Sequence, residues 1–229
     1  MIIDLAIFKD WIIKPYIIMV MLSIIFGTIY ISYKTYKVCS INKEHIFYIS
    51  FINIVTIITC GLAIDKVLYN NISFTSTGGA CGVIISGIVN SLIFNNKQML
   101  KIEISSLPLM YSVSKIGCTL AGCCGGRETT GLIGVKYINS NYGTDYYAVP
   151  IQLIEVITFA IIFIIFLKMY SKLSVYSMIA ICCISKTLLD YFRYTHNNGS
   201  ILSRNQVMCI VILLVMSVVQ YVLKKRSIK

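Results

Sequence analysis

The chain has 229 residues, of which 57% are hydrophobic and only 13% are charged. A soluble protein with so little charge could not cover its own core, and apolar runs of membrane length recur from Trp11 to Leu223. The composition therefore indicates a polytopic integral membrane protein. The net charge of +11 is spread over short loops rather than gathered on one module, which argues against a nucleic-acid partner.

The apolar windows predict an all-α fold with about seven transmembrane helices. The third window is short, so it reads as a thin span or a re-entrant segment. Its glycine-rich entry, Ser76 to Gly82, favours backbone that approaches some other group closely. The predicted spans are Trp11–Ile31, Ile46–Ile64, Gly79–Phe94, Ile104–Ala121, Ile151–Leu167, Val175–Leu189 and Val207–Val222.

The distribution of Lys and Arg over the loops orients these spans. The positive-inside rule places the N-terminus outside and the C-terminus in the cytoplasm. The acidic N-terminal residues do not fit a signal peptide, so we expect the first span to be retained. Residues 1–229 are predicted to form a single transmembrane domain, with residues 128–150 as an extracytoplasmic loop. Within that loop Gly131–Tyr137 reads as a short extended piece and Asn139–Gly143 as a turn.

The stretch from Ser114 to Arg127 is unusual for the end of a membrane span, because it combines a lysine, small residues and thiols. Glycines at membrane depth require burial in protein or access to water. An ionisable residue such as Lys115 within a span is a candidate functional residue and usually faces a polar cavity. In the simpler alternative, Lys115 extends to the interface and the glycines only allow close helix packing.

The end of the sixth predicted span carries Lys186, Asp190 and Arg193, whose spacing places them on one helix face. One interpretation is an internal Lys-Asp pair that needs no ligand. The other is that Asp190 orients the two cations, which bind an anion such as phosphate.

The head of the fifth predicted span begins at Pro150 and places Gln152 and Glu155 on one face. A buried Glu155 would serve as a structural partner for Lys115 or Lys186, or take part in catalysis. Together, three cations and two carboxylates from three spans predict a polar cavity of net positive charge, suited to a phosphate head group.

These motifs, in this order and spacing, resemble those of the prolipoprotein diacylglyceryl transferases. The resemblance covers roughly Thr77 to the C-terminus and is strongest from Lys115 to Glu155. The motifs that carry it are Lys115-Ile-Gly-Cys-x-x-x-Gly-Cys-Cys-x-Gly126, Gly134-Val-Lys-Tyr137, Pro150-x-Gln-Leu-x-Glu155, Lys186-x-x-x-Asp190-x-x-Arg193 and Gln206.

The resemblance implies a multi-pass transferase of the bacterial plasma membrane that needs no cofactor and no metal. It would move the diacylglyceryl group of phosphatidylglycerol to the lipobox cysteine thiol of a prolipoprotein, with glycerol phosphate as the leaving group. The implied catalytic residues are Lys115, Lys186, Glu155 and Thr77. The implied phospholipid-binding residues are Lys115, Arg127, Lys186, Arg193, Gly78, Gly79, Gly122 and Gly126. The residues expected to orient these groups are Gln152, Asp190, Cys118 and Cys123.

The chain departs from the family pattern at several positions. Thr77 stands where the family has a histidine, and lysines stand in place of two arginines, which removes bidentate phosphate binding. Asp190 replaces a glutamate, Cys118 an asparagine and Cys123 a glutamate. The base that would deprotonate the acceptor thiol is not evident, although Glu155 or a water relayed through Thr77 are candidates.

Two alternatives stay open at this point. One is a non-catalytic relative that binds lipid or a modified peptide, because the motif histidine is missing. The other is a membrane thiol or metal protein that uses Cys118, Cys123 and Cys124. Against the second, Cys118 and Cys123 would not stack on one face of a continuous helix, and structural zinc usually has four ligands.

Overall fold

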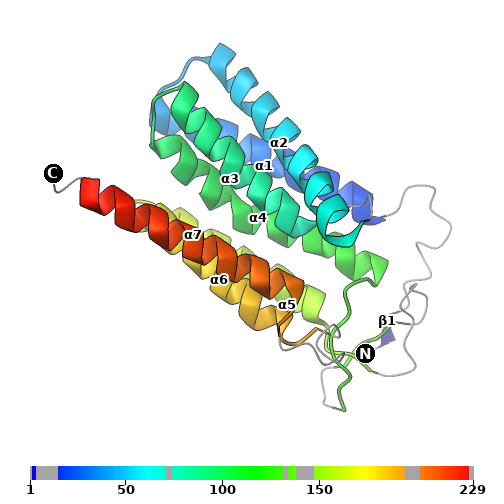
Figure 1. The fold of residues 1–229 in the computed structure, drawn as a ribbon. Coiled ribbons are helices and arrows are strands. Elements are labelled where there is room, and N and C mark those ends of the chain that lie inside the picture. The colour runs from blue at the N-terminus through cyan, green and yellow to red at the C-terminus, as the bar shows by residue number, and fades with distance from the viewer. Residues whose placement is uncertain are drawn as a thin grey trace. The chain divides into compact units, whose positions relative to one another are not determined.

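The computed structural model describes residues 2–3, 15–70, 74–130, 134–137, 147–193 and 202–226. Within these residues the chain is helical apart from its connections and one short pair of parallel strands (Figure 1). The helices are α1 (Pro15–Cys39), α2 (Lys43–Tyr69), α3 (Ser76–Ile93), α4 (Gln98–Ala121), α5 (Ile151–Lys168), α6 (Val175–Asp190) and α7 (Arg204–Arg226). The strands are β1 (Ile2–Ile3) and β2 (Lys136–Tyr137).

The described helices lie at the predicted spans in chain order, although the number of membrane spans stays a prediction. Their bounds differ most for α1, which continues to Cys39 although its apolar window ends at Ile31. Helix formation does not require the whole helix to be apolar, so α1 extends past Lys34 and Lys37 toward its polar end. The start of the first predicted span, Trp11 to Lys14, lies outside the described residues.

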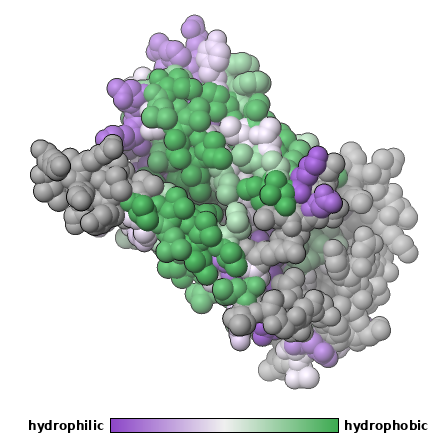
Figure 2. Space-filling view, in the orientation of Figure 1, coloured by the Kyte–Doolittle hydropathy of each residue, from purple (hydrophilic) through white to green (hydrophobic). Residues whose placement is uncertain are grey.

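Membrane character is evident from the length and surface of the helices. Among the described residues, four segments are long and apolar enough to cross a membrane, namely Pro15–Cys39, Lys43–Ile64, Ser76–Ile93 and Ile151–Lys168, and Asn205–Val218 is a shorter apolar stretch. Hydrophobic side chains cover much of the surface seen in Figure 2. Large apolar side chains on these helices are exposed, among them Phe51, Ile88, Ile161 and Leu214. An apolar surface of this kind suits lipid, and the protein is a multi-pass membrane protein.

The chain forms two compact units. One contains Met1–Val20, Ser112–Phe159 and Ile179–Lys229, and the other contains Met21–Tyr111 and Ala160–Met178. The single-domain organisation stays a prediction. We call the unit that contains Ser112–Phe159 the first unit and the unit that contains Met21–Tyr111 the second unit.

In the second unit, α3 packs closely on α2 through its glycines. A Cβ added to Gly78 would lie 2.6 Å from the carbonyl oxygen of Cys60, and one added to Gly82 would lie 2.6 Å from the Cα of Ile57. Small residues let two helix backbones approach in this way. The expectation that the Ser76–Gly82 stretch approaches some other group closely is thus confirmed, and the stretch itself is the first part of a helix.

The predicted extracytoplasmic loop is described only in part. Lys136 and Tyr137 form β2, which pairs with β1, so the extended piece between Gly131 and Tyr137 is confirmed over its last residues. The turn expected at Asn139–Gly143 lies outside the described residues.

Candidate functional site

The site begins where α4 ends. The amide of Gly122 donates to the carbonyl of Thr119, and the amide of Cys123 donates to the carbonyl of Cys118. Gly122 itself has a φ of 63°. This pattern is the Schellman motif, in which a left-handed glycine just after a helix lets its last carbonyls find donors. Gly122 therefore stops α4 and turns the chain back over its own last turn.

Main-chain hydrogen bonds join the segment after α4 to the segments that precede α5 and follow α6. The amide of Arg127 donates to the carbonyl of Phe192 at 2.9 Å, and the amide of Val149 donates to the carbonyl of Arg127 at 2.9 Å. Gly126 forms a bridge with Arg193. A Cβ at Gly126 would overlap the backbone of Val149, so only glycine fits there. The glycine thus serves backbone packing.

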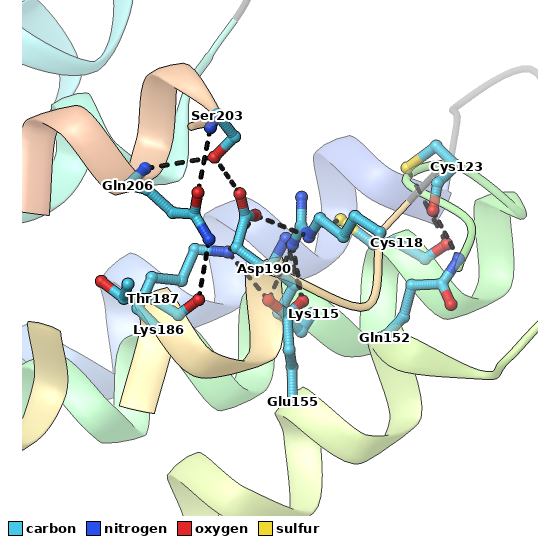
Figure 3. Close-up of polar contacts among 11 residues, drawn as sticks. Lys115, Cys118, Cys123, Gln152, Glu155, Lys186, Thr187, Asp190, Ser203 and Gln206 are labelled. Atoms are coloured by element: carbon cyan, nitrogen blue, oxygen red, sulfur yellow. Dashed lines mark hydrogen bonds and ion pairs between the residues drawn. The ribbon is translucent and has the colours of Figure 1, made fainter. Parts of the chain in front are cut away.

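Five ionisable side chains of the first unit meet in one buried cluster, drawn in Figure 3. They come from α4, α5, α6 and the residues just after α6, and we call them the ionic cluster. Their exposed fractions are between 0% and 7%. Its members are Lys115, Glu155, Lys186, Asp190 and Arg193.

Glu155 is the centre of the ionic cluster. One of its oxygens lies 2.8 Å from Lys186 Nζ and the other lies 3.5 Å from Lys115 Nζ. Nη2 of Arg193 donates to both oxygens at 2.7 Å. Ionic groups in an apolar setting lose several kcal/mol of hydration each, which only close pairing offsets. Glu155 therefore pairs with both Lys115 and Lys186, the two cations that the sequence offered as its partners.

Asp190 is the second carboxylate of the ionic cluster. Its Oδ1 lies 3.5 Å from Lys186 Nζ and 3.0 Å from Arg193 Nε. The expected spacing of these three residues therefore brings them together, although α6 ends at Asp190 and Arg193 follows the helix. The internal Lys-Asp pair exists, but it belongs to a larger ionic network rather than neutralising itself.

Ser203, the residue just before α7, contacts Asp190 and is itself held by Gln206 of α7. The Ser203 hydroxyl donates to Asp190 Oδ2. The amide of Gln206 donates to Ser203 Oγ at 3.2 Å, and the amide of Ser203 donates to Gln206 Oε1 at 3.0 Å. Gln206 Nε2 also donates to the carbonyl of Thr187. Ser203-x-x-Gln206 is a capping box, a sequence signal for a helix start that would have identified Ser203.

Gln152 and the thiols lie beside the ionic cluster. Gln152 Nε2 donates to the carbonyl of Cys123 at 2.6 Å, so the predicted orienting residue fixes the turn after α4. Cys118 Sγ lies 3.9 Å from Lys115 Nζ. The sulfur atoms of Cys118, Cys123 and Cys124 lie within 4.8 Å of one another. The expectation that Cys118 and Cys123 stay apart is wrong, because α4 ends at Ala121 and the chain turns back.

The remaining predicted residues occupy different places. The Arg127 guanidinium stacks on the Tyr191 ring, with 4.4 Å between its Cζ and the ring centroid, in the first unit. Thr77, Gly78 and Gly79 lie in the first turn of α3, in the second unit. There Thr75 caps the helix by accepting from the amide of Gly78, and the two buried glycines pack against α2 and Phe74.

The fold and the site together define a multi-pass membrane protein with a buried, cation-rich ionic cluster. Residues 4–222 match the prolipoprotein diacylglyceryl transferase family. The chain belongs to this family and is a transferase, which confirms the resemblance.

Two relatives from clostridia are similar to the chain. The phosphatidylglycerol–prolipoprotein diacylglyceryl transferase of Clostridium tetani is 27% identical over 188 residues, which cover 72% of this chain and 75% of the relative. The phosphatidylglycerol–prolipoprotein diacylglyceryl transferase 2 of Clostridium perfringens is 37% identical over 60 residues, or 26% of this chain and 23% of the relative.

Proposed function

We propose that this protein transfers the diacylglyceryl group of phosphatidylglycerol to the thiol of a prolipoprotein cysteine in the plasma membrane of a bacterium. The observation that carries the proposal is the ionic cluster, in which three cations and two carboxylates are buried together. The name of the Clostridium tetani relative supports the same two substrates. The positive excess suits the single negative charge of a phosphodiester.

The reaction forms a bond from sulfur to a glyceryl carbon and breaks the bond from that carbon to a phosphate oxygen. Glycerol phosphate leaves with the bonding electrons, and the thiol gives up its proton, since the thiolate is the nucleophile. Lys115, Lys186 and Arg193 hold the phosphate and stabilise the charge that grows on its oxygens. An ammonium has three N–H donors and a guanidinium five, so these groups can serve carboxylates and phosphate together.

Glu155 and Asp190 act as positioning residues in this scheme. Both Glu155 oxygens accept from cations, so they hold donors in place rather than collecting a proton from the thiol. Cys118 and Gln152 support the same region, through contacts with Lys115 and with the turn after α4. A water relayed through Thr77 is the candidate for thiol deprotonation, on the ground of the motif position alone. In the first unit, Arg127 would also bind the lipid, while Gly122 and Gly126 shape the backbone around it. A lipid-binding role for Gly78 and Gly79 rests on their motif alone.

The test is transfer of labelled diacylglycerol from phosphatidylglycerol to a lipobox peptide by the purified protein in detergent. Lys186→Ala removes a buried cation, whereas Lys97→Ala removes an exposed one and serves as the matched control. We expect the unmodified protein and Lys97→Ala to transfer the label and Lys186→Ala to lose about 100-fold, the usual size of such an electrostatic contribution. Undiminished transfer by a folded Lys186→Ala protein would refute the phosphate-holding role.

A further inference from the structure

Three thiols converge at the end of α4, and the proposed transfer reaction uses none of them as a reacting group. The sulfur atoms of Cys118, Cys123 and Cys124 all lie within 4.8 Å of one another. Thiolates bound to one zinc ion at about 2.3 Å stand about 3.8 Å apart in tetrahedral geometry. Contraction by about 1 Å, within the reach of small side-chain rotations, would therefore bring the three sulfurs onto a shared ion.

The backbone is arranged to bring these thiols together. The Schellman motif at Gly122 places Cys123 over Cys118, and Gln152 fixes the carbonyl of Cys123. Cys124 has a φ of 61°, the left-handed conformation that costs energy for any residue with a Cβ. Gly125, for which this conformation costs nothing, is the next residue, and a Cβ there would meet nothing within 4 Å. The backbone strain thus falls on Cys124, whose sulfur lies close to those of Cys118 and Cys123.

Charge supports the same assignment. A divalent ion with three thiolates carries one net negative charge, and the five members of the ionic cluster carry one net positive charge. Cys118 Sγ lies 3.9 Å from Lys115 Nζ, so the two charges would be adjacent.

We propose that Cys118, Cys123 and Cys124 form a three-thiolate site for a thiophilic metal ion of the Zn²⁺ class. Cys118 is buried, Cys123 is half-buried and Cys124 is exposed, so the site opens toward the side of Cys124. Three protein ligands leave the fourth position of a tetrahedral ion for water or a further ligand. A Cys118–Cys123 disulfide would use only two of the three sulfurs, and it would not explain the strained backbone conformation of Cys124.

The experiment uses the full-length protein, reduced and stripped of metal in mild detergent, and titrates it with Cd²⁺, whose thiolate complexes absorb in the ultraviolet. We expect one equivalent per chain, competed by Zn²⁺. Cys124→Ser should weaken binding at least about tenfold, because loss of even an outer partner of a metal site has that effect. Cys60→Ser, in α2 of the second unit, is the matched control and should bind as the unmodified protein does.

A second measurement needs no variant. The chain has nine cysteines, and Zn²⁺ should protect three of them, Cys118, Cys123 and Cys124, from alkylation by a maleimide, with the labelled positions read by peptide mass spectrometry. Equal labelling with and without Zn²⁺, an unchanged Cd²⁺ signal in Cys124→Ser, or a Cys118–Cys123 disulfide that persists under reduction would each overturn the proposal. None of these readouts depends on transfer activity, so the metal site and the proposed function can fail separately.

Discussion

Each of the two units contains a buried polar cluster, and the two clusters are built on opposite principles. The ionic cluster of the first unit pairs three cations with two carboxylates. In the second unit Glu103 of α4 is equally buried, but its partners are neutral: Ser86 donates to one oxygen, and Asn90 Nδ2 donates to the other at 2.7 Å. Asn90 also donates to Asn53 at 3.0 Å, which extends the cluster to α2.

The two clusters differ in charge balance, and this property indicates which buried polar group has a function beyond holding helices together. The Glu103 cluster ties α2, α3 and α4 together with hydrogen bonds between neutral groups and one carboxyl, a common way to hold helices in lipid. The ionic cluster carries an excess of positive charge in an apolar setting, which is costly unless an anion shares it. Burial alone does not separate the two clusters, but the balance of charge does.

The largest effect should come from Glu155→Gln. This change leaves three cations without the carboxylate at their centre, and breaking a buried ion pair costs about 3–5 kcal/mol. We expect a strongly lowered unfolding temperature in detergent and loss of transfer. Glu44→Gln, on the exposed start of α2, should change neither. A Glu155→Gln protein of normal stability and activity would show that the cluster is not organised around this carboxylate.

Transfer should fall next most steeply for Arg193→Ala, by about 100-fold, while Arg193→Lys retains part of the activity because it keeps the charge but loses the planar donor fork. Initial rates over a range of phosphatidylglycerol concentrations check this and separate lipid binding from the chemical step. If Arg193→Lys and Arg193→Ala were equally impaired, the geometry of the donors rather than their charge would be decisive.

Glu103 should respond differently from Glu155. Glu103→Gln keeps the size of the side chain and can exchange hydrogen bonds with Ser86 and Asn90, so stability should change by less than about 1 kcal/mol. Glu103→Leu leaves those groups without their acceptor and should cost about 1–3 kcal/mol. Thermal unfolding of the two variants side by side provides the comparison. A large loss in Glu103→Gln would mean that this cluster also depends on a negative charge.

A moderate effect should come from Ser203→Ala, which removes the capping hydroxyl of α7 and one partner of Asp190. Loss of such a cap costs about 0.5–2 kcal/mol. Transfer should persist at a reduced level, because the ion pairs of Asp190 with Lys186 and Arg193 are kept. Combined measurement of activity and unfolding temperature checks this, and activity lost without a change in stability would assign Ser203 a direct part in the reaction.

Much of the fold could be predicted from the sequence because lipid imposes a simple rule on helix length and polarity. Hydropathy located the seven described helices, and the intervals between Lys186, Asp190 and Arg193 anticipated their meeting. The ends of the helices were harder to predict, since α1 continues well past its apolar window. The convergence of the thiols was mispredicted because a helical spacing was assumed through Gly122, where the left-handed glycine stops the helix.

Other parts of the site depend on contacts that no local pattern encodes. That both Lys115 and Lys186 pair with Glu155 follows from how α4, α5 and α6 pack in the first unit, and spacing within one helix does not determine it. The same holds for the hydroxyl of Ser203 on Asp190, and the Ser203-x-x-Gln206 capping box that signals a helix start there was also missed in the sequence. The glycine stretch of α3 was more predictable, because close backbone approach is a property of glycine itself.

The main-chain bonds between the segments after α4 and after α6 make chain length itself a determinant of the site. Gly126 pairs with Arg193, and Arg127 with Phe192, so these residues keep a fixed register. One residue added between Gly122 and Gly126 would slide this register and carry the Arg193 guanidinium away from Glu155 with every side chain unchanged. For a protein engineer, the length of the segment between Gly122 and Gly126 must therefore be kept, even where its individual residues are exchanged.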